Sequence, residues 1–439
     1  MAEPRVFAVA GRPVLHSLSP VLFNAAFRKE AVPAVYTRIS AGDPAQALRF
    51  GRELGLIGMN VTAPFKEGVF ELLDAADETA AAVGAVNTLV REKAGFRGFN
   101  TDPAGVVDAL ERFGVGLQGK HCCVLGAGGA GRAAVFGLRS RGAAVVLCNR
   151  TDGKAERVAR RFGADAERWE KRSAVLAEAD ILVSALPPEA AAVRPEWLRP
   201  ELVVLEAAYP APPLSRAARD RGCRVIPGEE WLLRQAVPAF RLFMNSAPDE
   251  PGMERALRSP GKDPSGGGPH VALVGFMGSG KTTAGRLLAR RLGRAFLDTD
   301  EWVERRAGRA VSEIFRTEGE AFFRGLETDA LKEIFAGPAG VVCACGGGSM
   351  QSAANRAVVA GRSTVVWLHA SPAVCRARVD SSTRPLLDSR RMTAEAFEAL
   401  FRTRISCYAE AADIVVGSET QEDRTVETIH EEIRRAIAD

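Results

Sequence analysis

Short apolar runs separated by amphipathic stretches recur along most of the chain. Several runs have the length and composition of buried strands, at residues 5–11, 34–39, 58–63, the start of 121–131, 143–150, 179–186, 202–208 and 270–276. Stretches with helical spacing lie between them. This alternation predicts α/β domains built on parallel, doubly wound sheets.

One segment interrupts the pattern. Residues 259–269 contain no apolar residue other than proline, so they cannot bury enough surface to offset the entropy of ordering. As a flexible linker they would span about 17–20 Å, and a helix is expected directly before them at 250–258. The predicted domains are 1–258, composed of one lobe of 1–104 plus about 236–258 and a second lobe of 105–235, and 270–439 beyond the linker.

The length, charge and composition of the chain argue against nucleic-acid-binding, secreted and membrane-spanning proteins. The 439 residues suffice for two or three domains, and a net charge of +4 gives no reason to expect nucleic acid as a partner. The eight cysteines show no disulfide spacing, the start lacks a secretory signal, and no apolar run is long enough for a transmembrane helix. We therefore expect a protein of the reducing cytoplasm that acts on small molecules, without a membrane partner.

The first glycine-rich turn follows the strand that starts at residue 121. Its glycines have the GxGxxG spacing of a dinucleotide-binding turn, which lets a pyrophosphate rest on a helix N-terminus. Because a strand precedes it and a helix follows, the pattern predicts a bound dinucleotide. The glycines are Gly126, Gly128, Gly129 and Gly131.

The end of the next strand indicates which dinucleotide binds. An NAD site usually carries an acidic residue there, but this chain has Asn149, Arg150 and Thr151, with Lys154 close behind. A guanidinium suits a 2′-phosphate, which a carboxylate would repel. The sequence therefore favours NADP over NAD.

Polar residues gather at turns of the first lobe. Turn and cap chemistry would explain each one alone, since Ser, Thr, Asn and Asp favour such positions. Lys66 and Asp102 would also make a plausible proton-transfer pair, because a carboxylate can orient and tune an amine.

A second glycine loop, residues 275–282, is a complete phosphate loop between a strand and an amphipathic helix. Its amides can hold phosphates, Lys281 can neutralise them, and Thr282 can ligate Mg²⁺. Asp298 and Asp300 share one face at the end of the next strand and suit phosphoryl transfer, one near the metal and one near an acceptor hydroxyl. The nucleotide-binding residues expected here are Gly278, Ser279, Gly280, Lys281, Thr282 and Thr283.

The motifs of the first block, taken together, resemble shikimate dehydrogenases: HSLSP, NVTAPFK, GAVNT, GFNTD, GAGGAG and NRTDGK occur in the family's order. The resemblance covers residues 5 to about 245. It implies that Ser17 and Ser19 bind the substrate carboxylate and that Lys66 with Asp102 carries proton transfer. It also implies a Rossmann-type NADP lobe and further substrate contacts from Thr62, Asn87, Tyr209 and Gln235.

The sequence departs from the family pattern on the cofactor side. Residues 184–190 replace the usual Asn-Ala-Thr-Pro segment, Glu206 begins a changed segment that runs to Leu214, and Trp231 stands where methionine normally faces the nicotinamide. We expect an altered nicotinamide pocket beside intact substrate motifs.

The second block resembles shikimate kinase over residues 270–439, through GFMGSGKT, FLDTD, GEAFFR, GGG, RPLL and RxxxY. The resemblance implies that Asp298 holds Mg²⁺ through water and that Asp300 contacts the acceptor hydroxyls. Arg324 and Arg404 would bind the shikimate carboxylate, with backbone contacts from Gly347 and Gly348. Arg384 would come from a closing lid and meet the phosphates of ATP.

The implied function is a bifunctional enzyme that reduces 3-dehydroshikimate with NADPH and then phosphorylates shikimate with ATP and Mg²⁺. Two alternatives stay open at this point. One is a quinate-type dehydrogenase joined to another small-metabolite kinase, such as one acting on gluconate. The other is a sensor that binds shikimate or nucleotide without turnover. The sequence leaves oligomeric state undetermined.

Overall fold

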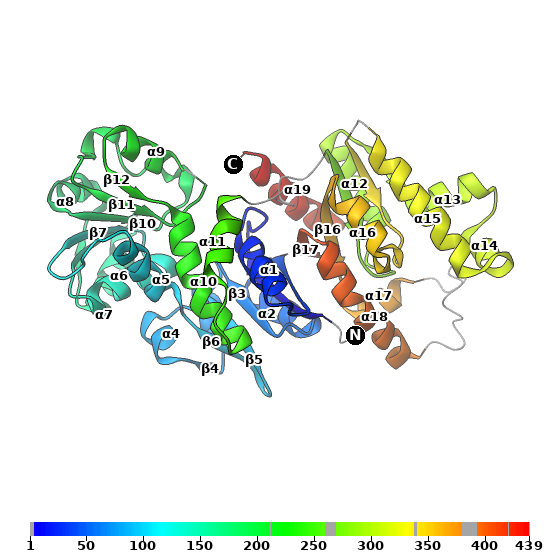
Figure 1. The fold of residues 1–439 in the computed structure, drawn as a ribbon, viewed down its shortest axis with the longest axis horizontal. Coiled ribbons are helices and arrows are strands. Elements are labelled where there is room, and N and C mark those ends of the chain that lie inside the picture. The colour runs from blue at the N-terminus through cyan, green and yellow to red at the C-terminus, as the bar shows by residue number, and fades with distance from the viewer. Residues whose placement is uncertain are drawn as a thin grey trace. The chain divides into compact units, whose positions relative to one another are not determined.

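Strands and helices alternate along the chain, as the hydrophobic pattern predicts (Figure 1). The computed structural model describes residues 4–210, 212–259, 269–337, 340–379, 393–419 and 421–438. Two compact units are present: Met1–Pro20 with Ala31–Ile57 and Pro260–Asp439, and Val21–Glu30 with Gly58–Ser259. The α/β class is confirmed, while the domain boundaries predicted above stay a prediction. Among the described residues, no helix is long and apolar enough to cross a membrane.

The first unit contains a sheet with the strand order β14-β15-β13-β16-β17-β2-β1. All of these neighbours pair in parallel. The strands are β1 (Arg5–Gly11), β2 (Ala34–Ser40), β13 (His270–Val274), β14 (Ala295–Asp298), β15 (Val341–Ala344), β16 (Ser363–His369) and β17 (Ile414–Gly417). Every residue of β13 and β16 is buried, which is what parallel strands covered on both faces require.

The first unit also contains nine α-helices among the residues that the structure describes. They are α2 (Pro44–Glu53), α12 (Lys281–Leu292), α13 (Thr299–Ala307), α14 (Val311–Thr317), α15 (Gly319–Ala336), α16 (Ala353–Ala360), α17 (Pro372–Arg378), α18 (Ala394–Ala411) and α19 (Glu422–Ala438). The start of α2 shows how the sequence sets a helix boundary. The Asp43 side chain accepts a hydrogen bond from Gln46 N, and Pro44 occupies the first helical position.

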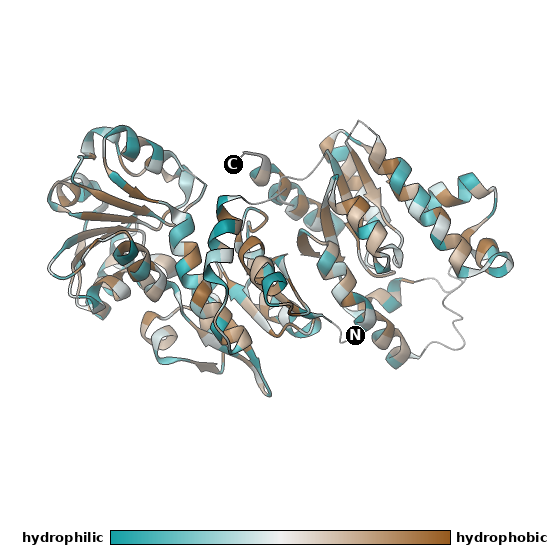
Figure 2. Ribbon diagram, viewed as in Figure 1, coloured by the Kyte–Doolittle hydropathy of each residue, from teal (hydrophilic) through white to brown (hydrophobic). Residues whose placement is uncertain are grey.

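The second unit contains a six-stranded sheet with the order β12-β11-β10-β7-β8-β9, all parallel. The strands are β7 (His121–Leu125), β8 (Ala144–Cys148), β9 (Asp165–Glu167), β10 (Ile181–Ser184), β11 (Val203–Glu206) and β12 (Arg224–Ile226). Figure 2 shows the central strands of this sheet largely brown and the outward faces of the surrounding helices partly teal, as expected for a sheet covered by amphipathic helices.

Four further strands of the second unit have the order β3-β5-β6-β4. They are β3 (Gly58–Val61), β4 (Ala75–Ala76), β5 (Thr88–Glu92) and β6 (Gly95–Phe99). β5 pairs antiparallel with both β3 and β6, so this part is not a purely parallel sheet. The remaining helices are α1 (Ser19–Lys29), α3 (Lys66–Glu71), α4 (Glu78–Val83), α5 (Asp102–Arg112), α6 (Gly129–Ser140), α7 (Asp152–Phe162), α8 (Arg172–Glu178), α9 (Pro213–Asp220), α10 (Gly228–Met244) and α11 (Glu250–Arg258).

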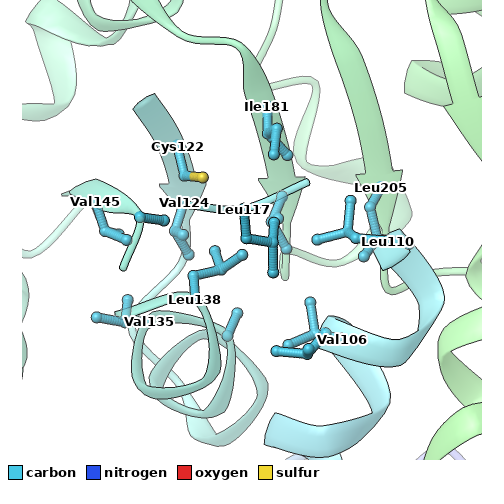
Figure 3. Close-up of a cluster of buried hydrophobic side chains, with 14 of the residues drawn as sticks. Val106, Leu110, Leu117, Cys122, Val124, Val135, Leu138, Val145, Ile181 and Leu205 are labelled. Atoms are coloured by element: carbon cyan, nitrogen blue, oxygen red, sulfur yellow. The ribbon is translucent and has the colours of Figure 1, made fainter. Parts of the chain in front are cut away.

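A hydrophobic core fixes helices against the six-stranded sheet. Figure 3 shows Leu138 of α6 and Val106 of α5 directed toward Val124 of β7 and Leu205 of β11. Leu138 is fully buried. Because α6 starts at the first glycine-rich turn, this packing also fixes the position of that turn.

We predict that Leu138→Ala lowers the free energy of unfolding by about 2–5 kcal/mol, since it removes buried methyl groups and leaves a cavity. The control is Leu72→Ala, because Leu72 is 52% exposed and its truncation should change stability by less than about 0.5 kcal/mol. Urea titrations followed by circular dichroism measure both midpoints. Equal midpoints for the two variants would contradict the assigned core.

Candidate active sites

Lys66 and Asp102 lie in contact in the second unit. They are the first residues of α3 and α5, and Lys66 Nζ is 2.5 Å from Asp102 Oδ2. The side chains are 15% and 6% exposed, so solvent screens the ion pair only weakly. Asn87 Nδ2 donates to the other carboxylate oxygen at 2.9 Å. An amine held this way can give a proton to a reacting oxygen beside it.

Asn87 connects this pair to two further polar residues. Its Nδ2 also donates to Thr101 Oγ1 at 2.9 Å and to Gln235 Oε1 at 3.0 Å, and its Oδ1 accepts from Thr101 N at 2.9 Å. The structure therefore brings together Lys66, Asp102, Asn87 and Gln235, which the sequence analysis singled out. Thr101 belongs to the same network, although the sequence analysis gave it no role. Thr62 lies partly buried in the turn between β3 and α3.

Trp231 supports the network from α10. The indole is 4% exposed, and its Nε1 donates to the backbone carbonyl of Asp102 at 3.1 Å. A Cβ at Gly105 would lie 3.0 Å from Trp231 Cδ1 and 2.8 Å from Gln235 Cβ, so α5 and α10 approach closely here. The indole thus helps to fix the backbone that carries the carboxylate.

The first glycine-rich turn has the backbone geometry that a dinucleotide needs. Gly126 has φ of 102°, and a Cβ at Gly131 would lie 1.8 Å from Gly126 O, so neither position accepts a side chain without a shift. Gly128 precedes α6, which begins at Gly129. A Cβ at Gly129 would lie 2.8 Å from Lys66 Cβ. The turn and the Lys66–Asp102 pair are therefore neighbours within this unit.

The residues expected near the 2′-phosphate differ in their surroundings. Asn149 Oδ1 accepts from Ala127 N at 3.2 Å, and its Nδ2 donates to Thr151 O at 3.1 Å, so it braces the turn. Arg150 is exposed. Lys154 Nζ, by contrast, contacts the Glu67 carboxylate at 3.0 Å, which also accepts from Arg132 at 2.7 Å. Glu67 and Arg132 could not be recognised from the sequence, because single charges on helices resemble solvated surface groups.

The segments that depart from the family pattern lie at the ends of β10 and β11. Glu206 ends β11, is 3% exposed, and accepts from Ser215 N at 3.1 Å and Ser215 Oγ at 2.9 Å. Burial raises the pKa of its carboxyl above the usual range, and the two bonds from Ser215 oppose that rise. Tyr209 follows and is partly buried. Glu206 thus has a local structural role near the start of α9.

Ser17 and Ser19 belong to the first unit. Both are buried, Ser17 Oγ donates to Ser19 Oγ at 3.3 Å, and Ser19 N donates to Ser17 Oγ at 3.3 Å. Arg38 Nε donates to Ser17 O at 2.9 Å and so fixes the backbone of the loop. Two adjacent hydroxyls are suitable donors for a carboxylate.

The phosphate loop of the first unit borders a cavity of about 360 Å³. Lys281 Nζ donates to the carbonyls of Gly275 and Phe276 at 2.9 Å each, so the ammonium lies folded over the loop. A Cβ at Gly278, where φ is 78°, would lie 2.3 Å from Cys375 O. Ser279 Oγ is buried and has no partner among the residues that the structure describes. These features fit a nucleotide phosphate.

Thr282 and Asp298 form the part of the cavity suited to a cation. Thr282 Oγ1 donates to Asp298 Oδ2 at 2.8 Å, and Asp298 Oδ1 accepts from Asp300 N at 2.9 Å. A hydroxyl and a carboxylate beside a phosphate loop are oxygen ligands of the kind that Mg²⁺ takes. Several residues that line the cavity belong to no sequence motif and could not be predicted: Arg378, Ser418, Glu422 and Thr425.

Arg404 is the strongest candidate for binding an anion next to the glycine triplet. It is 4% exposed, its Nη1 donates to Gly347 O at 3.0 Å, and its guanidinium lies 5.4 Å from the Phe276 ring centroid. Its Nε has no partner within the described part of the chain. Tyr408 OH donates to the same carbonyl at 2.5 Å. A buried guanidinium with an unused donor fits a carboxylate.

Arg324 lies against Gly348. Its Nη1 is 2.8 Å from buried Glu327 and its Nη2 is 2.9 Å from Glu320, and a Cβ at Gly348 would lie 2.3 Å from Nη2. A second cavity of about 450 Å³ borders Arg324, Gly348 and Asn355. Thr283 lines the nucleotide cavity, while Arg384 lies outside the described residues.

Three family models match the chain. They are "Shikimate dehydrogenase substrate binding domain" at residues 9–89, "Shikimate / quinate 5-dehydrogenase" at 108–203 and "Shikimate kinase" at 277–436. The shikimate dehydrogenase (NADP(+)) of Moorella thermoacetica is 38% identical over 288 residues, which cover 61% of this chain and 97% of the relative.

Solved structures agree with the two dehydrogenase matches. The shikimate dehydrogenase of Thermus thermophilus in complex with NADP(H) and shikimate is 35% identical, with a TM-score of 0.52 over 58% of this chain and 98% of that one. The quinate dehydrogenase of Corynebacterium glutamicum in complex with NAD is 29% identical, with a TM-score of 0.52 over 59% of this chain and 100% of that one. The chain belongs to the shikimate dehydrogenase family, and a shikimate kinase domain follows in the same polypeptide.

Proposed function

We propose that this chain catalyses two consecutive reactions of chorismate and aromatic amino acid biosynthesis. NADPH-dependent reduction of 3-dehydroshikimate gives shikimate, and ATP-dependent phosphorylation gives shikimate 3-phosphate. The observation that carries the proposal is that both groups of chemistry-bearing side chains occur in one polypeptide. Lys66 contacts Asp102 in the first group, and in the second Thr282 contacts Asp298 and Arg404 contacts the backbone of Gly347. The hydroxyl formed by the first reaction is the acceptor in the second.

In the dehydrogenase reaction, NADPH held at the first glycine-rich turn would supply the hydride for reduction of the C3 ketone. Lys66 Nζ supplies the proton to the ketone oxygen, and Asp102 orients the ammonium. Asn87, Thr62, Gln235 and Tyr209 bind and orient the substrate, while Ser17 and Ser19 bind its carboxylate. The contact between Lys66 and the glycine turn supports this assignment, because it brings the proton donor next to the cofactor loop.

In the kinase reaction, bound ATP with Mg²⁺ supplies the phosphoryl group. The phosphate-loop amides would donate hydrogen bonds to the phosphates, Lys281 would neutralise them, and Thr282 directly and Asp298 through water would hold Mg²⁺. Asp300 accepts the proton of the C3 hydroxyl. Arg324, Arg404 and the backbone of Gly347 and Gly348 bind the shikimate carboxylate, and the lid residue Arg384 contacts ATP.

Quinate is the nearest alternative substrate, since one of the matching family models names both acids. The kinase match favours shikimate, because the dehydrogenase reaction would then produce the acid that a shikimate kinase consumes. Gluconate also carries a carboxylate that Arg404 could bind, so the shikimate kinase match at residues 277–436 is what favours shikimate over gluconate. A sensor without turnover would not need Lys66, Asp102, Lys281 and Asp300 together.

We propose that the protein works in a reducing cytoplasm on small molecules. The eight free cysteines support this proposal, since seven of them are buried and none is paired in a disulfide among the described residues.

The two activities should be separable by mutation. Lys66→Ala should abolish NADPH oxidation and leave ATP-dependent phosphorylation of shikimate within about twofold, because it removes the proton donor alone. Lys281→Ala should do the reverse. Coupled assays of both reactions on each purified variant check this. Loss of both activities in a variant that keeps its circular dichroism spectrum would contradict the assignment.

Gly348→Ala should raise the kinase KM for shikimate about tenfold or more. A Cβ there collides with Arg324 Nη2, whereas φ of −106° is suitable for alanine, so the guanidinium must move. Gly325→Ala is the matched control, because a Cβ at that position in α15 meets nothing within 4 Å. Steady-state kinetics at saturating ATP compares them. An unchanged KM in Gly348→Ala would remove Arg324 from the carboxylate site.

Arg150 should select NADP. Arg150→Ala should raise the KM for NADPH much more than that for NADH and shift the preference by about ten- to a hundredfold, at about 1.4 kcal/mol per decade. The double variant Arg150→Ala/Lys154→Ala tests whether Lys154 gives up its contact with Glu67 and binds the 2′-phosphate when Arg150 is absent. Kinase activity is the internal control. A wild-type preference for NADH, or an unchanged preference in the double variant, would show that this strand end does not select the cofactor.

A further inference from the structure

The last helix of the kinase region ends against the loop that carries the two dehydrogenase serines. Glu432 of α19 is 2% exposed. Its Oε2 accepts from Val14 N and Leu15 N at 2.9 Å each, and its Oε1 accepts from Ser40 Oγ at 2.6 Å. All three donors belong to the dehydrogenase part of the sequence, although Glu432 follows them by about four hundred residues in the printed sequence.

These bonds act on the loop directly before Ser17. Val14 and Leu15 are almost fully buried, so their N–H groups require an acceptor, and the carboxylate provides one to both. Val14 O in turn accepts from Ser17 N at 3.0 Å. Val14 therefore links Glu432 to the backbone of Ser17 through two hydrogen bonds.

A second connection reaches the same loop from Asp413, the residue directly before β17. Asp413 O accepts from Arg38 Nη1 at 3.3 Å, and Arg38 Nε donates to Ser17 O at 2.9 Å. Arg38 is 2% exposed. Thr37 Oγ1 donates to Ala412 O at 3.1 Å beside it. Two independent contacts thus run from the kinase region to the backbone of Ser17.

The neighbouring glutamate provides a comparison within the same helix. Glu431 contacts Arg12 at 2.8 Å, but the two side chains are 47% and 32% exposed. An exposed ion pair of this kind contributes little. Removing a buried acceptor leaves two buried N–H groups unpaired, which is far more costly. Truncation of Glu432 should therefore disturb the loop far more than truncation of its neighbour Glu431.

We infer that Glu432, in the kinase region, is a positioning residue for the dehydrogenase reaction, because it holds the loop whose serines bind the substrate carboxylate. This inference rests on the proposed function of Ser17 and Ser19. The kinase domain then supplies part of the scaffold of the dehydrogenase substrate site. Glu432 itself does not touch the substrate.

The test measures shikimate oxidation with NADP⁺ and shikimate phosphorylation on full-length variants. Glu432→Ala should raise the dehydrogenase KM for shikimate about tenfold or more, with kcat, the KM for NADP⁺ and the kinase parameters within about twofold. Glu432→Gln should restore most of the affinity, since its oxygen can accept from Val14 and Leu15 and its amide can donate to Ser40. Glu431→Ala is the matched control and should behave as wild type.

Ser40→Ala removes a single bond to the same carboxylate and should raise the KM for shikimate about two- to fivefold. If Glu432→Ala does not fold, the KM of Ser40→Ala for shikimate tests the inference in its place. A wild-type KM in Glu432→Ala, or in Ser40→Ala where the former is insoluble, overturns the inference. So does a fall in kcat at unchanged KM, which would indicate only a smaller folded fraction.

Ser17→Ala separates this inference from the function on which it rests. If Ser17→Ala raises the KM for shikimate and Glu432→Ala does not, the serine assignment stands and the positioning role fails. If Ser17→Ala leaves the KM unchanged, the serine assignment itself fails.

Discussion

The pairing of β17 with β2 is the constraint on which the first unit depends. An edge strand leaves a row of N–H and C=O groups that must find partners. Here Val415 and Val416 of β17 pair in parallel with Ile39 and Ser40 of β2, so the sheet of the kinase region continues into the first strands of the chain. His369 of β16 also reaches Glu53 of α2 at 2.7 Å. Residues from the two enzyme regions thereby share one compact unit.

Both phosphate-binding turns follow from the same rule of parallel sheets. Each turn lies after a buried strand, β7 or β13, and before a helix whose N-terminal amides can donate to an anion. The glycines are required by close approach: Gly131 lies under the carbonyl of Gly126, and Gly278 lies against that of Cys375.

The residues that the sequence could predict are those that contribute to local motifs. Lys66, Asp102 and Asn87 stand in short segments with a recognisable spacing, and the structure brings all three together. Glu432 could not be predicted, because a glutamate on an amphipathic helix looks like a solvated charge until the partner loop is known. The antiparallel hairpin of β5 and β6 was also missed, since its strands are short and partly exposed. Long-range contacts leave no trace in local periodicity.

The central claim is that one polypeptide carries out both consecutive steps. The most direct measurement incubates the purified full-length protein with 3-dehydroshikimate, NADPH, ATP and Mg²⁺ and follows the products by mass spectrometry. The account predicts that shikimate 3-phosphate accumulates while NADPH and ATP are consumed in equal amounts. Accumulation of unphosphorylated shikimate in the presence of ATP, or no oxidation of NADPH, would contradict it.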